Sequence, residues 1–245
     1  MRFEPENVCV PMTFTPPEKP PAFEPIETWP GLADMARLQK LLWAAKAPIV
    51  LAGGSRWSEA ARASVARFAE RFDIPVATSF RRGPLMDWRH ESYAGDLGIG
   101  PNPKLLARVK AADLVVLVGG RMSEMPSQSY TLFDIPEPQM PFVHVHPGVE
   151  ELGRVYHAHL AVNATPTAFC VALKDVTLKQ NSGWAAETKQ AHADYISWTE
   201  KATPQPGAVN FGEIIVWLRE RVPDAILCNG AGNFTTGRRR PGFRS

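Results

Sequence analysis

One short segment limits the fold of this chain more than any other. Residues 113–118 read Asp-Leu-Val-Val-Leu-Val, and Gly119, Gly120 and Arg121 follow directly. A continuous apolar run is typical of a strand that is buried on both faces, and such strands occur almost only in parallel sheets covered by helices. The segment therefore predicts an α/β fold in which residues 115–117 lie at the centre of the sheet.

Helical and strand patterns alternate throughout residues 32–176. Leu38, Leu41, Leu42 and Ala45 recur at helical spacing and predict a helix over residues 32–46. Comparable patterns predict two further helices and four further strands, at residues 65–72, 105–109, 49–52, 74–77, 142–146 and 160–162. Strands that alternate with helices imply crossover connections. We therefore predict one doubly wound parallel sheet of about five or six strands.

Composition divides the chain into four segments. Residues 1–31 hold eight prolines. Proline fixes its own φ and lacks an N–H, so this density excludes a helix and predicts a proline-rich linker. We place the central α/β domain at residues 32–176. The polar residues 177–209 predict a second linker, which is partly helical around residues 184–201.

The fourth segment, residues 210–245, predicts the start of a second α/β unit. Asn210 is followed three residues later by Glu213, a capping-box pattern that predicts a helix start. An apolar strand and a glycine turn come next, at residues 225–237. A parallel sheet needs a crossover of a dozen or more residues and a second strand beyond such a turn. The remaining residues carry neither pattern, so we expect a truncated unit, from a frameshift, an early stop or a partial gene.

Charge and cysteine content exclude several classes of protein. The net charge of +2 gives no general nucleic-acid or membrane signature, and the run Arg238–Arg240 is better explained as a solvated tail. Three widely spaced cysteines form neither a disulfide framework nor a C-x-x-C knuckle. Together with a start that resembles no signal peptide, this predicts a cytoplasmic protein.

Three strands are followed by glycine turns, at Gly53-Gly54, Gly119-Gly120 and Gly230–Gly232. The carboxyl ends of parallel strands form the ligand crevice of α/β sheets, where glycine lets the backbone approach a phosphate. Glycine is also the least strained turn residue, which is the alternative for any one turn. None of the turns is a G-x-G-x-x-G or P-loop motif. Three turns at one edge favour a nucleotide crevice.

Charged and catalytic residue types give weaker signals. Arg121 could pair with a pyrophosphate at the end of its strand, or form an ordinary surface ion pair. His144 and His146 face one side of a predicted strand, and His157 and His159 repeat the spacing. A zinc site needs three or four converging ligands, so structural histidines are favoured over a metal site. We predict no catalytic residue, since no nucleophile elbow or acid–base pair is present.

Several segments resemble the central domain of thiamine-diphosphate-dependent enzymes, above all the acetolactate synthase large subunit. They are Ala47-Pro-Ile-Val-Leu-Ala-Gly-Gly54, Ser79-Phe-Arg-Arg-Gly-Pro-Leu-Met-Asp87, Tyr93-Ala-Gly-Asp-Leu-Gly-Ile-Gly100, residues 112–121 and Val143-His-Val-His-Pro147. Residues 224–234 resemble the opening of that family's third domain. The resemblance implies a Rossmann-like central domain, and full-length relatives that decarboxylate a 2-oxo acid and join or release the aldehyde unit.

The resemblance also implies cofactors and site residues. Thiamine diphosphate and Mg²⁺ serve the full-length family, which forms homo-oligomers, and the central domain of acetolactate synthases binds FAD. Carried over by position, the FAD-binding residues are Gly53, Gly54, Gly95, Leu97, Gly98, Gly119 and Arg121. Gly232 and Asn233 fall where the third domain contacts thiamine diphosphate. Many members have an acidic residue where His146 stands, near the adenosine.

Two parts of the family's catalytic machinery have no match in this sequence. These are the glutamate of the first domain that activates the cofactor, and the metal-binding Gly-Asp-Gly motif of the third. We therefore expect a homologue that is inactive alone. The alternative, from a different class of protein, is a stand-alone nucleotide-binding or scaffolding α/β module without catalysis.

Overall fold

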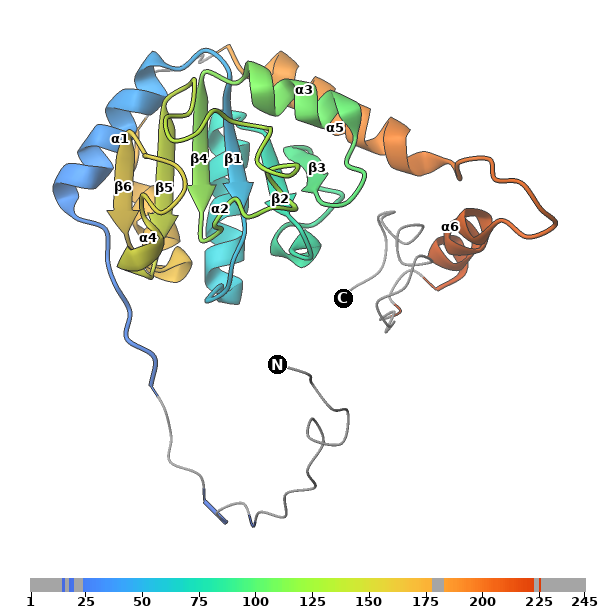
Figure 1. The fold of residues 1–245 in the computed structure, drawn as a ribbon, viewed down its shortest axis with the longest axis horizontal. Coiled ribbons are helices and arrows are strands. Elements are labelled where there is room, and N and C mark those ends of the chain that lie inside the picture. The colour runs from blue at the N-terminus through green and yellow to red at the C-terminus, as the bar shows by residue number, and fades with distance from the viewer. Residues whose placement is uncertain (1–14, 16–17, 20–23, 178–182, 223–224, 226–245) are drawn as a thin grey trace, which may run out of the picture.

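The computed structural model describes residues 15, 18–19, 24–177, 183–222 and 225. Figure 1 shows one six-stranded sheet with the order β3-β2-β1-β4-β5-β6, in which every neighbouring pair is parallel. The strands are β1 (Pro48–Ala52), β2 (Val76–Ser79), β3 (Tyr93–Leu97), β4 (Leu114–Val118), β5 (Phe142–His146) and β6 (Leu160–Asn163). The predicted α/β class and doubly wound parallel sheet are therefore confirmed.

Strand β4 lies at the centre of the sheet, as its apolar run predicts. Its five residues are all buried. Val116 is in register with Val50 of β1 on one side and with Val143 of β5 on the other. The flanking strands shield both edges of β4, and packed layers cover both of its faces, which explains why the strand tolerates no polar residue.

Helices cover both faces of the sheet: α1 (Leu32–Ala44), α2 (Glu59–Phe72) and α4 (Pro166–Ala172) on one face, and α3 (Pro103–Ala111) on the other. Two more helices, α5 (Ala185–Glu200) and α6 (Phe211–Arg221), follow in the chain. Leu38 of α1, Val65 of α2 and Phe169 of α4 belong to the core on one face. Leu105 of α3 and Phe133 of the loop after β4 belong to the core on the other.

Strands β2 and β3 differ from the sequence prediction. Ile74 is not in β2, because its N–H bonds to Ala69 O at the end of α2, where Asp73 takes a left-handed conformation with φ of 54°. The strand starts two residues later, at Val76. Strand β3 was not predicted, because Gly95 and Asp96 interrupt its apolar pattern. Helix α4 is only seven residues long and was also not predicted.

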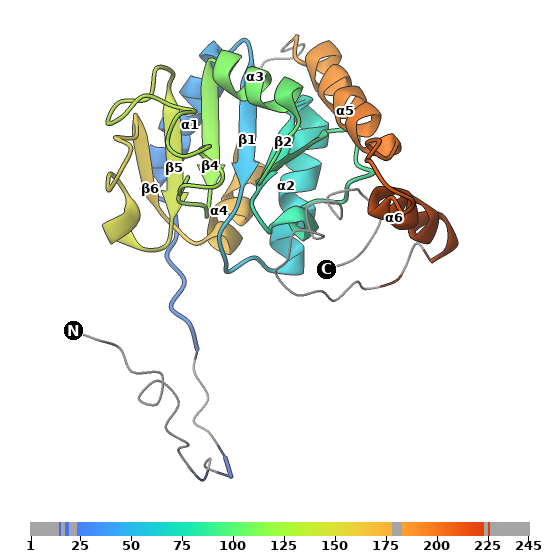
Figure 2. The ribbon, with the colours of Figure 1, turned by 45° about the vertical axis from the view of Figure 1, so that its right-hand side comes forward.

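Helix α5 runs beside β3 at the edge of the sheet (Figure 2). The Nδ1–H of His192 donates to the β3 carbonyl of Tyr93, with the two atoms 2.9 Å apart. The rings of Tyr93 and Tyr195 meet edge to face at 4.8 Å. The sequence predicts a partly helical linker here. The helix is present, and it is packed against the domain.

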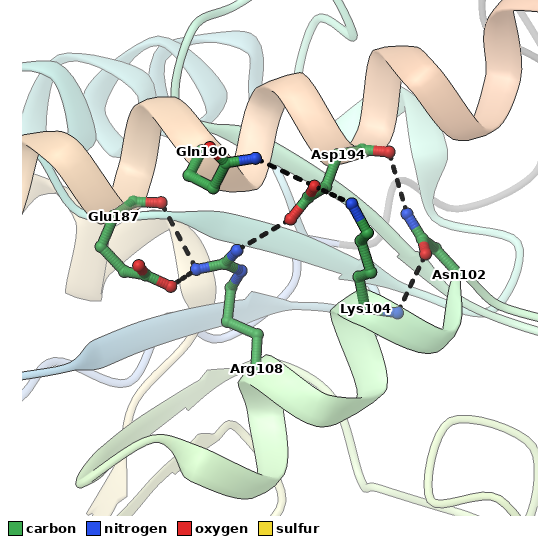
Figure 3. Close-up of polar contacts among 6 residues, drawn as sticks. All are labelled: Asn102, Lys104, Arg108, Glu187, Gln190 and Asp194. Atoms are coloured by element: carbon green, nitrogen blue, oxygen red, sulfur yellow. Dashed lines mark hydrogen bonds and ion pairs between the residues drawn. The ribbon is translucent and has the colours of Figure 1, made fainter.

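A polar cluster around the buried Asp194 joins α5 to α3 (Figure 3). The Asp194 carboxylate accepts from Lys104 Nζ at 2.7 Å and from an Arg108 guanidinium nitrogen at 3.1 Å. Gln190 donates to the same carboxylate, and Arg108 also pairs with Glu187. Burial raises the pKa of Asp194, but the hydrogen bonds from these cations and from Gln190 outweigh it, so the net pKa is lowered.

Helix α6 begins as its capping pattern predicts. The side-chain oxygen of Asn210 accepts from Gly212 N at 2.9 Å, while its Nδ2 donates to Glu213 at 3.3 Å. Glu213 thus bonds to the capping side chain. The predicted strand and turn after α6 lie outside the described residues, apart from Ala225. The limits of the predicted segments, at residues 31, 176 and 209, stay predictions.

None of the helices within the described ranges is long and apolar enough to cross a bilayer.

Candidate functional site

The sheet has one topological switch point, between β1 and β4. From this point the chain proceeds to β2 and β3 on one side and to β5 and β6 on the other. Ligands of open α/β sheets bind in the crevice outside the carboxyl ends of the strands at such a point. The turns Gly53-Gly54 and Gly119-Gly120 follow β1 and β4 directly. The structure therefore brings two of the three predicted glycine turns to the expected crevice.

The two turns touch each other. A Cβ atom on Gly54 would lie 1.7 Å from Gly119 O, and one on Gly53 would lie 3.1 Å from the Cα of Gly120. Gly54 and Gly119 also have positive φ angles, of 69° and 76°. Contact between the backbones thus explains these glycines even without a ligand, and any ligand must lie over the turns rather than between them.

Two aromatic ring nitrogens bond to carbonyl groups of these turns. The indole N–H of Trp57 donates to Gly53 O at 2.7 Å, and Nε2 of His144 lies 2.9 Å from Gly120 O. Burial lowers the pKa of His144 to about 4, so the ring is neutral near pH 7. Because a carbonyl oxygen can only accept, the single proton of the neutral imidazole is on Nε2.

Arg121 follows the β4 turn, at the carboxyl edge of the sheet. Its guanidinium is 3.4 Å from Glu151, which also pairs with Arg154 at 3.1 Å. The Arg121 side chain is 59% exposed, whereas that of Glu151 is 13% exposed. Burial raises the pKa of Glu151, but the two arginines outweigh it and the net pKa is lowered. The surface ion pair considered for Arg121 is present, and its exposure leaves the guanidinium accessible to a ligand.

The predicted residues of β3 have packing roles. A Cβ atom on Gly95 would lie 3.2 Å from the Tyr195 ring and 3.4 Å from Leu105. The Leu97 side chain is fully buried. The Gly98 carbonyl accepts from Gln128, a residue of the loop after β4, at 3.2 Å. These contacts account for all three residues, and their contact with a ligand stays a prediction.

The remaining candidates are the residues predicted to contact thiamine diphosphate and the possible metal ligands. Gly232 and Asn233 lie outside the described residues. Among the residues that are described, no three histidine, cysteine or acidic side chains converge as metal ligands. His144 and His146 share one side of β5, with ring centres 5.9 Å apart. Nδ1 of His159 accepts from Phe142 N at 3.3 Å.

Sequence reasoning missed three contributors to this edge. Trp57 and His144 bond to the glycine turns, and Glu27 bridges Arg56 and Thr165 beside the β1 turn. Their partners lie up to 138 positions away along the chain. Only the alternation of His144 and His146 on one strand was visible as a signal.

The comparisons with known proteins agree with this architecture. Residues 35–173 match the family described as "Thiamine pyrophosphate enzyme, central domain". This span covers more than half of the chain, and the chain belongs to that family. The resemblance stated from the sequence is therefore confirmed, and thiamine diphosphate is the cofactor that the family implies.

Three curated relatives show the range of the similarity. Sulfoacetaldehyde acetyltransferase of Alcaligenes xylosoxydans is 29% identical over 80% of this chain and 31% of the relative. The acetolactate synthase large subunit of Corynebacterium glutamicum is 22% identical over 93% of this chain and 36% of the relative. A 3D-(3,5/4)-trihydroxycyclohexane-1,2-dione hydrolase of Geobacillus thermodenitrificans is 36% identical over 44% of this chain and 17% of the relative. The chain thus spans about a third or less of the length of these relatives.

The donor set of the crevice fits a diphosphate. The amides of Gly53 and Gly119 donate to Val118 O and Val145 O, whereas no such bond occupies the amide of Gly54 among the described residues. A backbone amide and an accessible arginine, here Arg121, are groups that bind phosphate oxygens in proteins. A flavin or adenine dinucleotide supplies such a diphosphate.

Proposed function

We propose that this chain supplies the central, nucleotide-binding domain of a thiamine-diphosphate-dependent enzyme that acts on 2-oxo acids. The enzyme would decarboxylate the acid and join or release the aldehyde unit. The observation that carries the proposal is the meeting of two glycine turns at the switch point of this family's sheet. The enzyme is further proposed to be a cytoplasmic homo-oligomer that binds neither nucleic acid nor membranes.

FAD is the first candidate for the nucleotide. The N–H groups of Gly53 and Gly119 donate to Val118 O and Val145 O, so these two glycines would shape the turns. The backbone N–H of Gly54 would hold the diphosphate, with Arg121 as the charged partner. Arg121 suits this role because its planar guanidinium can donate two parallel hydrogen bonds to a phosphate. When bound, FAD supplies a planar flavin that the enzyme holds mainly as a structural group.

Titration calorimetry of the purified chain with FAD and with ADP tests the proposal. We expect saturable binding of both, since they share the adenosine diphosphate unit. Bovine serum albumin at the same concentration measures nonspecific binding. A chain that is folded by circular dichroism and binds neither compound would contradict the nucleotide-binding role.

A scaffolding module without a ligand is the second candidate. The contact of 1.7 Å that a Cβ on Gly54 would make with Gly119 favours it, because packing alone then requires the glycines. The same calorimetry separates the two candidates. Only a nucleotide-binding domain gives saturable binding of FAD and ADP.

Chemistry on the 2-oxo acid is not proposed for the described residues. The half-buried Glu151 and the exposed Glu27 are each paired with arginine. With thiamine diphosphate and Mg²⁺ added, pyruvate turnover by these 245 residues is expected to stay at background. Turnover above background that is lost in Asn233→Ala would place the active site within this chain.

A further inference from the structure

The two glycine turns are held in the same way, although they follow different strands. In each turn a ring N–H donates to the carbonyl of a buried glycine: Trp57 to Gly53, and His144 to Gly120. The two donors come from different places in the fold. Trp57 follows β1 in the loop before α2, and His144 lies within β5.

Each of these bonds also fixes the direction of an amide. In a trans peptide the C=O and the N–H of the same unit point in opposite directions. The carbonyl of Gly53 points to the indole of Trp57, so the N–H of Gly54 points away from it. In the same way, the N–H of Arg121 points away from the buried imidazole of His144.

Both amides belong to residues that solvent reaches. Gly54 is half-buried and Arg121 is exposed, whereas Gly53 and Gly120 are buried. Within the described ranges neither amide is hydrogen-bonded to another residue. A donor on the carbonyl also polarises the peptide, which strengthens the N–H of the same unit as a donor.

We infer that Trp57 and His144 are positioning residues, which hold the amides of Gly54 and Arg121 ready for the oxyanions of a diphosphate. This inference rests on the proposed nucleotide-binding function and adds the residues that pre-organise the site. The inference concerns only the diphosphate of the ligand. The base and the flavin would contribute to the affinity through other contacts.

Three substitutions, two that remove a donor and one that restores it, test the inference with little change in volume. Trp57→Phe keeps an aromatic ring and removes the N–H. His144→Leu removes the donor, and His144→Gln restores one. Each loss of a donor is expected to weaken binding of ADP and of inorganic pyrophosphate by about fivefold to tenfold, the equivalent of one hydrogen bond. His144→Gln is expected to recover part of the affinity.

The readout must separate positioning from a general structural role. Adenosine lacks the diphosphate, so its binding is expected to be the same in the wild type and the variants. Trp198→Phe is the matched control, because Trp198 is 51% exposed on α5 and away from the crevice. Thermal melting shows that each variant is folded. If adenosine and ADP weaken together, Trp57 and His144 serve the fold alone and the inference is overturned.

Pyrophosphate makes the two proposals separable. If the wild type binds pyrophosphate but no nucleotide, and Trp57→Phe weakens that binding, the positioning role stands and the nucleotide-binding role fails. If the wild type binds FAD and the variants bind it equally well, the nucleotide-binding role stands and the positioning role fails. A wild type that binds none of these probes overturns both.

Discussion

Two acidic side chains, Asp194 and Glu151, are each surrounded by cations, but in different settings. Asp194 lies between α3 and α5, and its partner Arg108 has a side chain that is only 12% exposed. Glu151 lies at the crevice, where the side chains of Arg121 and Arg154 are 59% and 64% exposed. Buried charges depend on their partners far more than exposed ones do. The first cluster therefore stabilises the fold, whereas the second leaves cations accessible to an anionic ligand.

The largest effect is expected at Asp194. In Asp194→Asn, Arg108 stays largely buried and keeps only Glu187 as a carboxylate partner. The free energy of unfolding should therefore fall by about 3 kcal/mol, the lower end of the range for a broken buried pair. Urea denaturation followed by circular dichroism measures this. Asp87→Asn is the control, because Asp87 pairs with Arg89 on the surface, and it should change stability by less than about 1 kcal/mol. Equal losses in the two variants would remove the distinction between buried and exposed clusters.

The free energy of unfolding should depend on pH through His144. Its pKa falls from 6.5 to about 4 on folding, so the unfolded chain binds the proton more readily. Stability is therefore lost as pH falls from about 6.5 to about 4, by about 3 kcal/mol from this group. The difference in unfolding free energy between wild type and His144→Gln, measured across this range, isolates the contribution. A difference that is constant with pH would show that His144 is not held neutral.

Arg121→Ala should weaken FAD binding by about 1–3 kcal/mol, the value of a charge-assisted hydrogen bond. Stability should change little, because the Arg121 side chain is exposed. Calorimetry with FAD measures the loss, and Arg89→Ala is the control for removal of an exposed arginine. Unchanged FAD binding would mean that Arg121 serves only its ion pair with Glu151.

The smallest effect is expected for Glu151→Gln. The substitution releases Arg121 and Arg154 from a shared carboxylate, so pyrophosphate should bind a few-fold more tightly. Stability should change by less than about 1 kcal/mol, because both arginines are largely solvated. A loss of stability as large as that of Asp194→Asn would show that the crevice cluster is structural too.

The sequence predicts those parts of the molecule that depend on residues close together in the chain. The apolar run of β4 and the glycine turns each follow from a few neighbouring residues. Strand β3 was missed because Gly95 is there to admit Tyr195, a residue 100 positions later. The packing of α5 was missed because its buried residues include Thr188 and Asp194, which break the apolar stripe that predicts a packed helix.

The candidate site also has some parts that the sequence predicts and others that it does not. Glycines at strand ends identify the crevice, and Arg121 is read from its place after β4. The His144 donor cannot be identified in this way, because its pairing with Gly120 depends on β5 lying beside β4. No local spacing carries that information.

The bond between His192 and the Tyr93 carbonyl has a consequence for assembly. A sheet grows by adding a strand to an unpaired edge, which is also how unrelated chains associate by accident. With α5 laid along β3, growth on that side would first require the helix to leave. Extension of the sheet at β3 is thus controlled by a helix that lies beyond the stretch matching the family.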